Sequence, residues 1–148
     1  MGWKANCILV STQEDGVFRT FPNHDSALAA EIVERLPLAK HRFGEKSTFE
    51  RGMSPEPGQL VVGAYPGAAI IGHDELCLAC FGDRIPRVVT ELWKLFPTAK
   101  ILAVLLHSVV NQFGYALFTD GKMIRQRIGA DGQATFEFGI PLPEEEPL

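Results

Sequence analysis

The chain has 148 residues, of which 46% are hydrophobic and 22% charged, and its formal net charge is −4. That length and composition are typical of one globular domain and fit poorly with a disordered or a membrane-spanning chain. Three of the negative charges fall in 144–146, so the remaining chain is nearly neutral, and a strongly basic nucleic-acid-binding surface is not expected.

The first quarter of the chain is predicted to contain two strands and a helix. The apolar run 3–10 indicates a strand in the interior of a sheet, and 17–21 indicates a weaker second strand after a turn. Asn23 or Asp25 can cap a helix that runs to about Leu36, because the apolar residues there recur at helical spacing. This pattern predicts an amphipathic helix that packs on the sheet.

The next segments are shorter and more polar. Residues 41–51 form at most an edge strand, and 53–58 is predicted to be a loop because it contains two prolines. Two strands follow, over 59–64 and 68–71, and the Tyr-Pro-Gly sequence at 65–67 is predicted to turn the chain between them.

The second helix and the most apolar strand come next. The helix is predicted over 85–96, since its apolar residues form one stripe and Pro86 suits its first turn. The run 100–110 is the clearest strand, and its unbroken apolar stretch predicts that both of its faces are covered.

The C-terminal third is predicted to be a three-stranded meander. Strands over 113–118 and 123–128 flank the Asp-Gly pair at 120–121, which is suited to a tight hairpin turn, and a third strand follows over 134–138. Residues 141–148 are rich in proline and glutamate and are predicted to be an irregular, solvated tail.

These elements predict an α+β fold, because the strands do not alternate regularly with the helices. We expect a single mixed or mostly antiparallel sheet of about 6–8 strands, with two helices packed mainly on one face. Residues 1–140 are expected to form a single domain, followed by the acidic, proline-rich tail 141–148.

The Cys-x-x-Cys sequence at Cys77 and Cys80 is the first candidate for chemistry. This spacing brings two sulfur atoms to one side of a turn, where they can bind zinc or exchange electrons. A closed zinc site needs two more ligands, and only Cys7 and His73 are plausible. Because the flanking residues are apolar, we favour the alternative that these cysteines pack in the core. No metal or cofactor is therefore expected.

His107 is the second candidate, with Ser108, Asn111 and Tyr65 as possible neighbours. Adjacent residues of a regular strand point to opposite faces, so His107 and Ser108 are not expected to act as base and nucleophile. His107 and Asn111 share a face if the strand continues, and the amide would then orient the imidazole. We favour the alternative of a histidine held by hydrogen bonds at a strand end.

The basic residues are few and scattered. The densest group, Lys122, Arg125 and Arg127, is interpreted as a solvated face of the predicted hairpin rather than as a phosphate contact. Neither a nucleic acid nor a membrane is expected as a partner, since the longest apolar run, 101–106, is far shorter than a membrane span.

Five short segments resemble, in chain order, an uncharacterised family of small bacterial proteins that is known only as a domain of unknown function. They are Met1–Lys4, Gly63–Gly67, His107–Asn111, Asp120–Gly121 and Gly139–Glu144. The resemblance implies a single bacterial cytosolic domain and supplies no activity. In this family the residue at the place of Asn111 is acidic, so the departure here weakens a catalytic role for His107. The Cys-x-x-Cys sequence is outside the family pattern, which also favours packing for Cys77 and Cys80.

The leading functional hypothesis is a non-catalytic module that binds a protein partner or a small ligand, of the accessory or immunity type by analogy. The first alternative is a small enzyme, such as a hydrolase, with His107 as its base. The second is a metal or redox site at Cys77 and Cys80. The cytoplasm is the expected location, since the odd number of cysteines does not suggest a secreted disulfide framework. An exposed edge strand also allows a symmetric homodimer.

Overall fold

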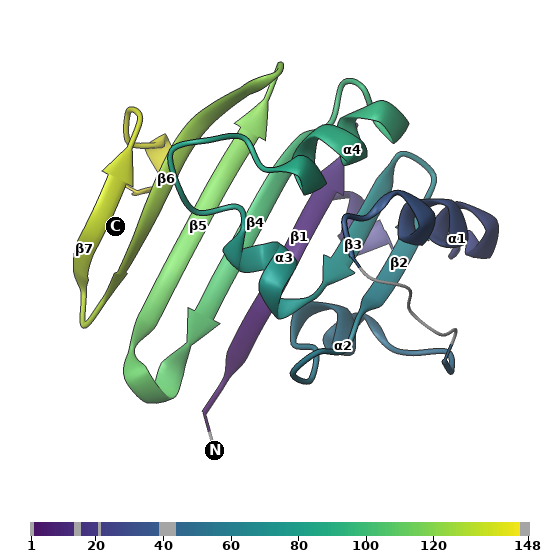
Figure 1. The fold of residues 1–148 in the computed structure, drawn as a ribbon, viewed down its shortest axis with the longest axis horizontal. Helices are drawn as coiled ribbons and strands as arrows, with labels where there is room; N and C mark the ends of the chain where they lie inside the picture. Colours follow the sequence, from purple (N-terminus) through teal and green to yellow (C-terminus); the bar gives the residue numbers. More distant parts are fainter. Residues whose placement is uncertain (1, 14–15, 21, 39–43, 146–148) are drawn as a thin grey trace.

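A computed structural model describes residues 2–13, 16–20, 22–38 and 44–145. These residues form one sheet of seven strands in the order β2-β3-β1-β4-β5-β6-β7 (Figure 1). Each neighbouring pair is antiparallel. The strands are β1 Lys4–Ser11, β2 Val61–Tyr65, β3 Ala68–Gly72, β4 Lys100–His107, β5 Gln112–Thr119, β6 Lys122–Ala130 and β7 Gln133–Phe138. The predicted α+β class and the single antiparallel sheet are confirmed.

Four α-helices accompany the sheet over the described residues, rather than the two that were predicted. They are α1 Ser26–Arg35, α2 Phe49–Met53, α3 Asp74–Leu78 and α4 Arg87–Leu95. Three 3-10 turns are also present: η1 Val17–Thr20, η2 Ser108–Val110 and η3 Pro143–Glu145. The predicted helices correspond to α1 and α4, whereas α2 and α3 have only five residues each and show too little periodicity to be predicted.

The N-terminal strand β1 lies at the centre of the sheet, as its apolar sequence predicted. It pairs with β3 on one side and with β4 on the other, so that Cys7 lies opposite both Gly72 and Val104. Because β1 joins the two halves of the sheet, the elements from β2 to α3 and those from β4 to β7 meet only through it within the sheet.

The main core lies between the sheet and the three helices α1, α3 and α4. These helices cover what we call the front face, which is turned towards the viewer in Figure 1. Helix α1 begins where the Asp25 carboxylate accepts a hydrogen bond from the Leu28 amide at 3.0 Å. Alternate residues of each strand supply the sheet side of this core, among them Ile8, Val10, Ile71, Ile101, Ala103, Leu105, Ala116 and Phe118.

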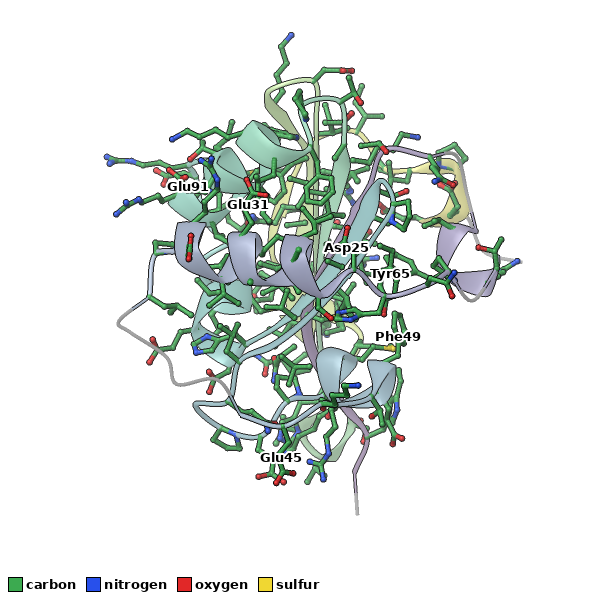
Figure 2. The ribbon with its side chains drawn as sticks, turned by 90° about the vertical axis from the view of Figure 1, so that its right-hand side faces the viewer. Asp25, Glu31, Glu45, Phe49, Tyr65 and Glu91 are labelled. Carbon is green, nitrogen blue, oxygen red and sulfur yellow. The ribbon has the colours of Figure 1, made fainter. Side chains whose placement is uncertain are left out.

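The opposite side, the back face, is covered over only part of its width. Helix α2 packs on β1, β2 and β3, and the carbonyl of its Gly52 lies so close to Gly72 that a side chain has no room at Gly72. Phe18 of η1 contacts Phe49 of α2 and Tyr65 of β2, with ring centroids 5.4 and 6.0 Å apart. Figure 2 shows Phe49 and Tyr65 on the side of the sheet opposite α1.

Two predicted strands differ from the structure. Residues Val17–Thr20 form the 3-10 turn η1 instead of a strand, and Phe21 lies outside the described residues. The strand predicted over 100–110 ends at His107, because Ser108–Val110 form a 3-10 turn and Asn111 adopts a left-handed conformation with φ of 49°. Of the polar segment 41–51, residues 41–43 lie outside the described residues, and the last part begins α2.

The C-terminal meander of β5, β6 and β7 is confirmed, but the prediction of a solvated basic face is wrong for Arg125, although Lys122 is exposed. Arg125 is only 3% exposed, not part of a solvated face. The tail is also not fully irregular, since Pro143–Glu145 form η3 and Glu145 binds Arg125. A buried guanidinium requires such a partner, and a carboxylate near the chain end provides it.

Candidate functional site

The structure does not bring the predicted catalytic residues together. His107 ends β4 with its side chain on the front face, as shown by its pairing opposite Lys4 and Gln112. The exposed hydroxyl of Ser108 accepts a hydrogen bond from the backbone amide of Trp3 at 2.6 Å. That bond holds the N-terminal segment against η2, which is a structural use of the hydroxyl group.

Asn111 is bonded to the turn between β6 and β7 and not to His107. Its side-chain amide donates a hydrogen bond to the Asp131 carboxylate at 3.0 Å, and the Asp131 amide donates to the Asn111 carbonyl at 3.1 Å. The expected shared face with His107 depended on a continuous strand, and the strand ends at His107. The Nδ1 atom of His107 is buried and has no hydrogen-bond partner among the described residues.

Tyr65 lies at the other end of the strands. It pairs opposite Ala68 on β3, which pairs with Ser11 on β1, and Ser11 in turn pairs with Lys100 at the start of β4. Its ring lies on the back face and contacts Phe18. Burial raises the pKa of the Tyr65 hydroxyl, so the group is a weak acid in this position. Tyr65 and His107 therefore belong to opposite ends and opposite faces of the sheet.

All three cysteines are buried and have free thiols: Cys77 and Cys80 lie in the core on the front face, whereas Cys7, opposite Gly72 and Val104, lies on the back face of β1. The thiol of Cys77 donates to the carbonyl of Val104 at 3.2 Å, and the thiol of Cys80 donates to the carbonyl of Leu76 at 3.4 Å. Burial raises the pKa of Cys7 and of Cys77 to about 12, and it raises the pKa of Cys80 as well. Thiols held in the protonated form are poor nucleophiles and poor metal ligands.

His73 is occupied as the cap of α3. Its Nδ1 atom accepts a hydrogen bond from the Leu76 amide at 3.3 Å, and the side chain is 4% exposed. The charged residues that follow it, Asp74 and Glu75, form the first turn of α3. Among the described residues, no group of three or more histidine, cysteine or acidic side chains is arranged to hold a metal ion.

The most connected polar group is centred on Arg125, on the back face of β6. Its guanidinium donates to both carboxylate oxygens of Glu145 at 2.8 Å and to Glu137 at 2.9 Å. It also donates to the carbonyls of Phe138 and Gly139 at 3.2 and 3.1 Å. These bonds use all the donors of the guanidinium group, so Arg125 has no donor left for a ligand.

The same contacts explain the electrostatics of this group. Hydrogen bonds from Arg125 lower the pKa of Glu145 to about 2, and the bond to Glu145 raises the pKa of Arg125. Arg127 lies next to it, forms an ion pair with Glu137 at 3.1 Å and stacks over Phe113 at 5.5 Å. The cluster therefore fastens η3 to the back of the sheet.

A further feature, which the sequence did not predict, is an apolar surface beside this cluster. We call it the open face; its members point to the back from β1, β4 and β5 and remain partly exposed. They are Leu9, Leu102, Val104, Leu106, Phe113, Tyr115 and Leu117. Trp3, which is 61% exposed, adjoins one end of it beside a shallow hollow of about 270 Å³ between β1 and α2.

The open face is bounded on both sides. Of the described helices, only α2 packs on the back face, and its main contacts are with β1, β2 and β3. On the other side, η3 is held over β6 by Arg125. Between these two boundaries, the outward side chains of β4 and β5 form an apolar floor.

The apolar run of β4 contained a signal for this surface, but an ambiguous one. An unbroken run indicates that both faces of a strand are apolar, and we expected both to be covered within the chain. Ile101, Ala103 and Leu105 are buried against the helices of the front face, whereas Leu102 and Leu106 are only half-buried. The apolar run therefore predicted that the back of β4 is apolar, but it did not predict that other parts of the chain leave this side partly exposed.

No described helix has both the length and the apolar character needed to cross a bilayer. Comparison with known proteins gives one match: a family model described as a family of unknown function (DUF6928) matches residues 5–148. No curated protein and no solved structure matches the chain.

Proposed function

The chain belongs to the DUF6928 family, to which no activity is assigned, and we propose that it is a non-catalytic module that binds a protein partner through the open face. The observation that carries this proposal is a contiguous apolar surface on a sheet whose other face is covered by helices over its central strands. Large exposed apolar patches on a folded domain usually mark interaction sites.

The arrangement of the polar candidates supports a binding role over a catalytic one. His107, Ser108 and Asn111 make separate contacts or none, and Tyr65 lies at the far end of the sheet. Catalysis by a base and a nucleophile needs the two groups within hydrogen-bond reach of each other. The described hydrogen bonds supply no such pair.

The same proposal places the protein in the bacterial cytoplasm. Three free, buried thiols suit a reducing compartment, and the family resemblance described above is to small bacterial proteins.

The proposal is tested by capture of a partner with matched surface variants. Leu106 lies on the open face, and Leu78 is 51% exposed on α3 on the other side of the sheet. We expect gentle purification of the tagged chain to recover one stoichiometric partner, which Leu106→Glu loses and Leu78→Glu retains. The charge added at Leu106 must be desolvated when the partner binds, whereas the charge at Leu78 stays in water.

Two outcomes contradict the proposal. One is that no partner is recovered at any of several salt concentrations, and the other is that both variants affect recovery equally. Circular dichroism and thermal unfolding check that each variant is folded. Leu106→Gln, which is uncharged and close in size, serves as the second variant if Leu106→Glu does not fold.

A further inference from the structure

Building on the proposed function, we infer that the partner binds the open face through a single amphipathic α-helix that carries acidic residues beside its apolar stripe. The dimensions, area and charge of the surface favour this class of occupant. A second copy of this chain, or an extended strand, is the competing occupant.

The width of the open face matches one helix. From β1 to β6 there are three inter-strand spacings, about 14 Å in total. An α-helix with its side chains is about 10–12 Å wide. Helix α2 and the turn η3 flank this floor, so they would block an element wider than one helix from contacting it.

The area of the open face suits a helix better than a second sheet. The eight residues of β4 span about 27 Å, which gives a floor of about 400 Å² when combined with the width above. A stable protein–protein interface buries about 800 Å² from each partner. Two sheets in contact lie about 10 Å apart, and α2 and η3 obstruct that approach. A helix of about 18 residues has the length of the floor.

The front face shows that these strands accept helices. Helix α3 packs on β1 and β4 from that side through Leu76 and Cys77. The outward residues on the back of β4 and of the neighbouring β5 include Leu, Val, Phe and Tyr, which are side chains that pack well against a helix.

The charges around the open face are mainly positive. Lys100 and Lys122 are exposed at one end of it, on the same face as their cross-strand neighbours Ser11 and Thr119. On the β6 side, Arg125 and Arg127 are paired with Glu137 and Glu145, so this border has no net charge and the uncompensated charges are those of the two lysines. Acidic residues on the flanks of a bound helix complement these lysines.

The experiment uses synthetic 18-residue peptides as probes and the full chain labelled for NMR. The first peptide has leucines at helical spacing with glutamates on the flanks. The second has the same composition in a scrambled order, the third alternates leucine and glutamate like a strand, and the fourth replaces the glutamates by lysine. We expect the first to shift resonances of the β4 and β5 residues and to bind about tenfold more tightly than the others.

Two matched single variants and one double variant are tested with the peptides. Leu106→Glu is expected to abolish these shifts, and Leu78→Glu is expected to leave them unchanged. The double variant Lys100→Glu, Lys122→Glu, at exposed positions, should remove the preference for the acidic peptide over the lysine peptide. Equal binding of the four peptides, or shifts outside the open face, would overturn the inference.

The inference and the proposed function fail in different ways. If a native partner is captured through Leu106 but the helical peptide does not outperform the strand-like peptide, only the helical occupant is wrong. If Leu106→Glu has no effect on partner capture, the open face is not the binding surface, and both are wrong.

Discussion

At the scale of single residues, Arg125 shows how a buried charge is made compatible with the fold. Its side chain is 3% exposed, and its neighbours compensate its charge with two carboxylates and two carbonyls. Glu145 contributes two of these bonds although it comes from the end of the chain. The contact therefore couples the position of the C-terminal segment to the stability of β6.

Glu145→Gln is expected to lower the free energy of unfolding by about 1.5–3 kcal/mol, because hydrogen bonds to charged groups contribute about that much. The neighbouring Glu144→Gln is the matched control, since Glu144 is exposed and takes part in no described hydrogen bond. Urea unfolding of the two variants measures the difference. Equal midpoints for both variants would show that the Arg125 contact adds nothing to stability.

The same contact predicts a pH dependence. The pKa of Glu145 is lowered in the folded state from its ordinary value of 4.5 to about 2. The contribution to stability is therefore fully present above about pH 4.5 and is lost as the pH falls towards 2. The stability difference between the parent chain and Glu145→Gln should shrink over that interval, as measured by urea unfolding at a series of pH values. A difference that stays constant down to pH 2 would contradict this assignment.

At the scale of secondary-structure elements, the approach of α2 to the sheet depends on two glycines. A Cβ atom at Gly72 would overlap the backbone carbonyl of Gly52, and a Cβ atom at Gly52 would touch Ile70. Helix α2 has only five residues and owes its place to this close packing rather than to intrinsic helix stability. Without it, the back of β3 would be exposed.

Gly72→Ala is expected to displace α2 and to destabilise the chain by about 1–3 kcal/mol, the usual effect of an added group in a well-packed region. Gly44→Ala is the control, because a Cβ atom at Gly44 meets no other atom within 4 Å. Thermal unfolding of both variants, with hydrogen exchange of the α2 amides, measures the effect. If Gly72→Ala leaves both unchanged, the contact between α2 and β3 is looser than described.

At the scale of the whole molecule, the two sides of the sheet are unequal. Three helices cover the front face, while α2, η1 and η3 cover only the flanks of the back face. Apolar side chains on β4 and β5 are thus half-buried in the isolated chain, and a bound partner would complete their burial. The edge strand β7 is interrupted by an irregularity in its pairing with β6, which disfavours edge-to-edge association.

We expect the isolated chain to be a monomer for these reasons. Light scattering coupled to gel filtration, at micromolar concentration, should give the mass of one chain, 16.3 kDa. Twice that mass, retained in a variant that disrupts β7 but lost in Leu106→Glu, would indicate that the open face binds a second copy. That result would contradict the geometric argument for a single helix.

Much of the architecture followed from local patterns. The α+β class, the interior position of 3–10, the helices α1 and α4 and the C-terminal meander were predicted because each has a clear period, cap or turn signal. The short helices α2 and α3 were missed, since five residues contain too little of a helical period. The end of β4 at His107 was also missed, because the residues after it, Val109 and Val110, are typical of strands.

The sequence by itself determined the composition of each face of the sheet, through the alternation of side chains along the strands. Only the tertiary structure decided which faces are covered, because cover depends on where distant segments pack: α2 against Ile70 and Glu145 against Arg125. It also decided that His107, Asn111 and Tyr65 lie apart. The strand ends after His107, and the pairing of the strands places Tyr65 at the other end of the sheet; a local sequence pattern contains neither of these facts.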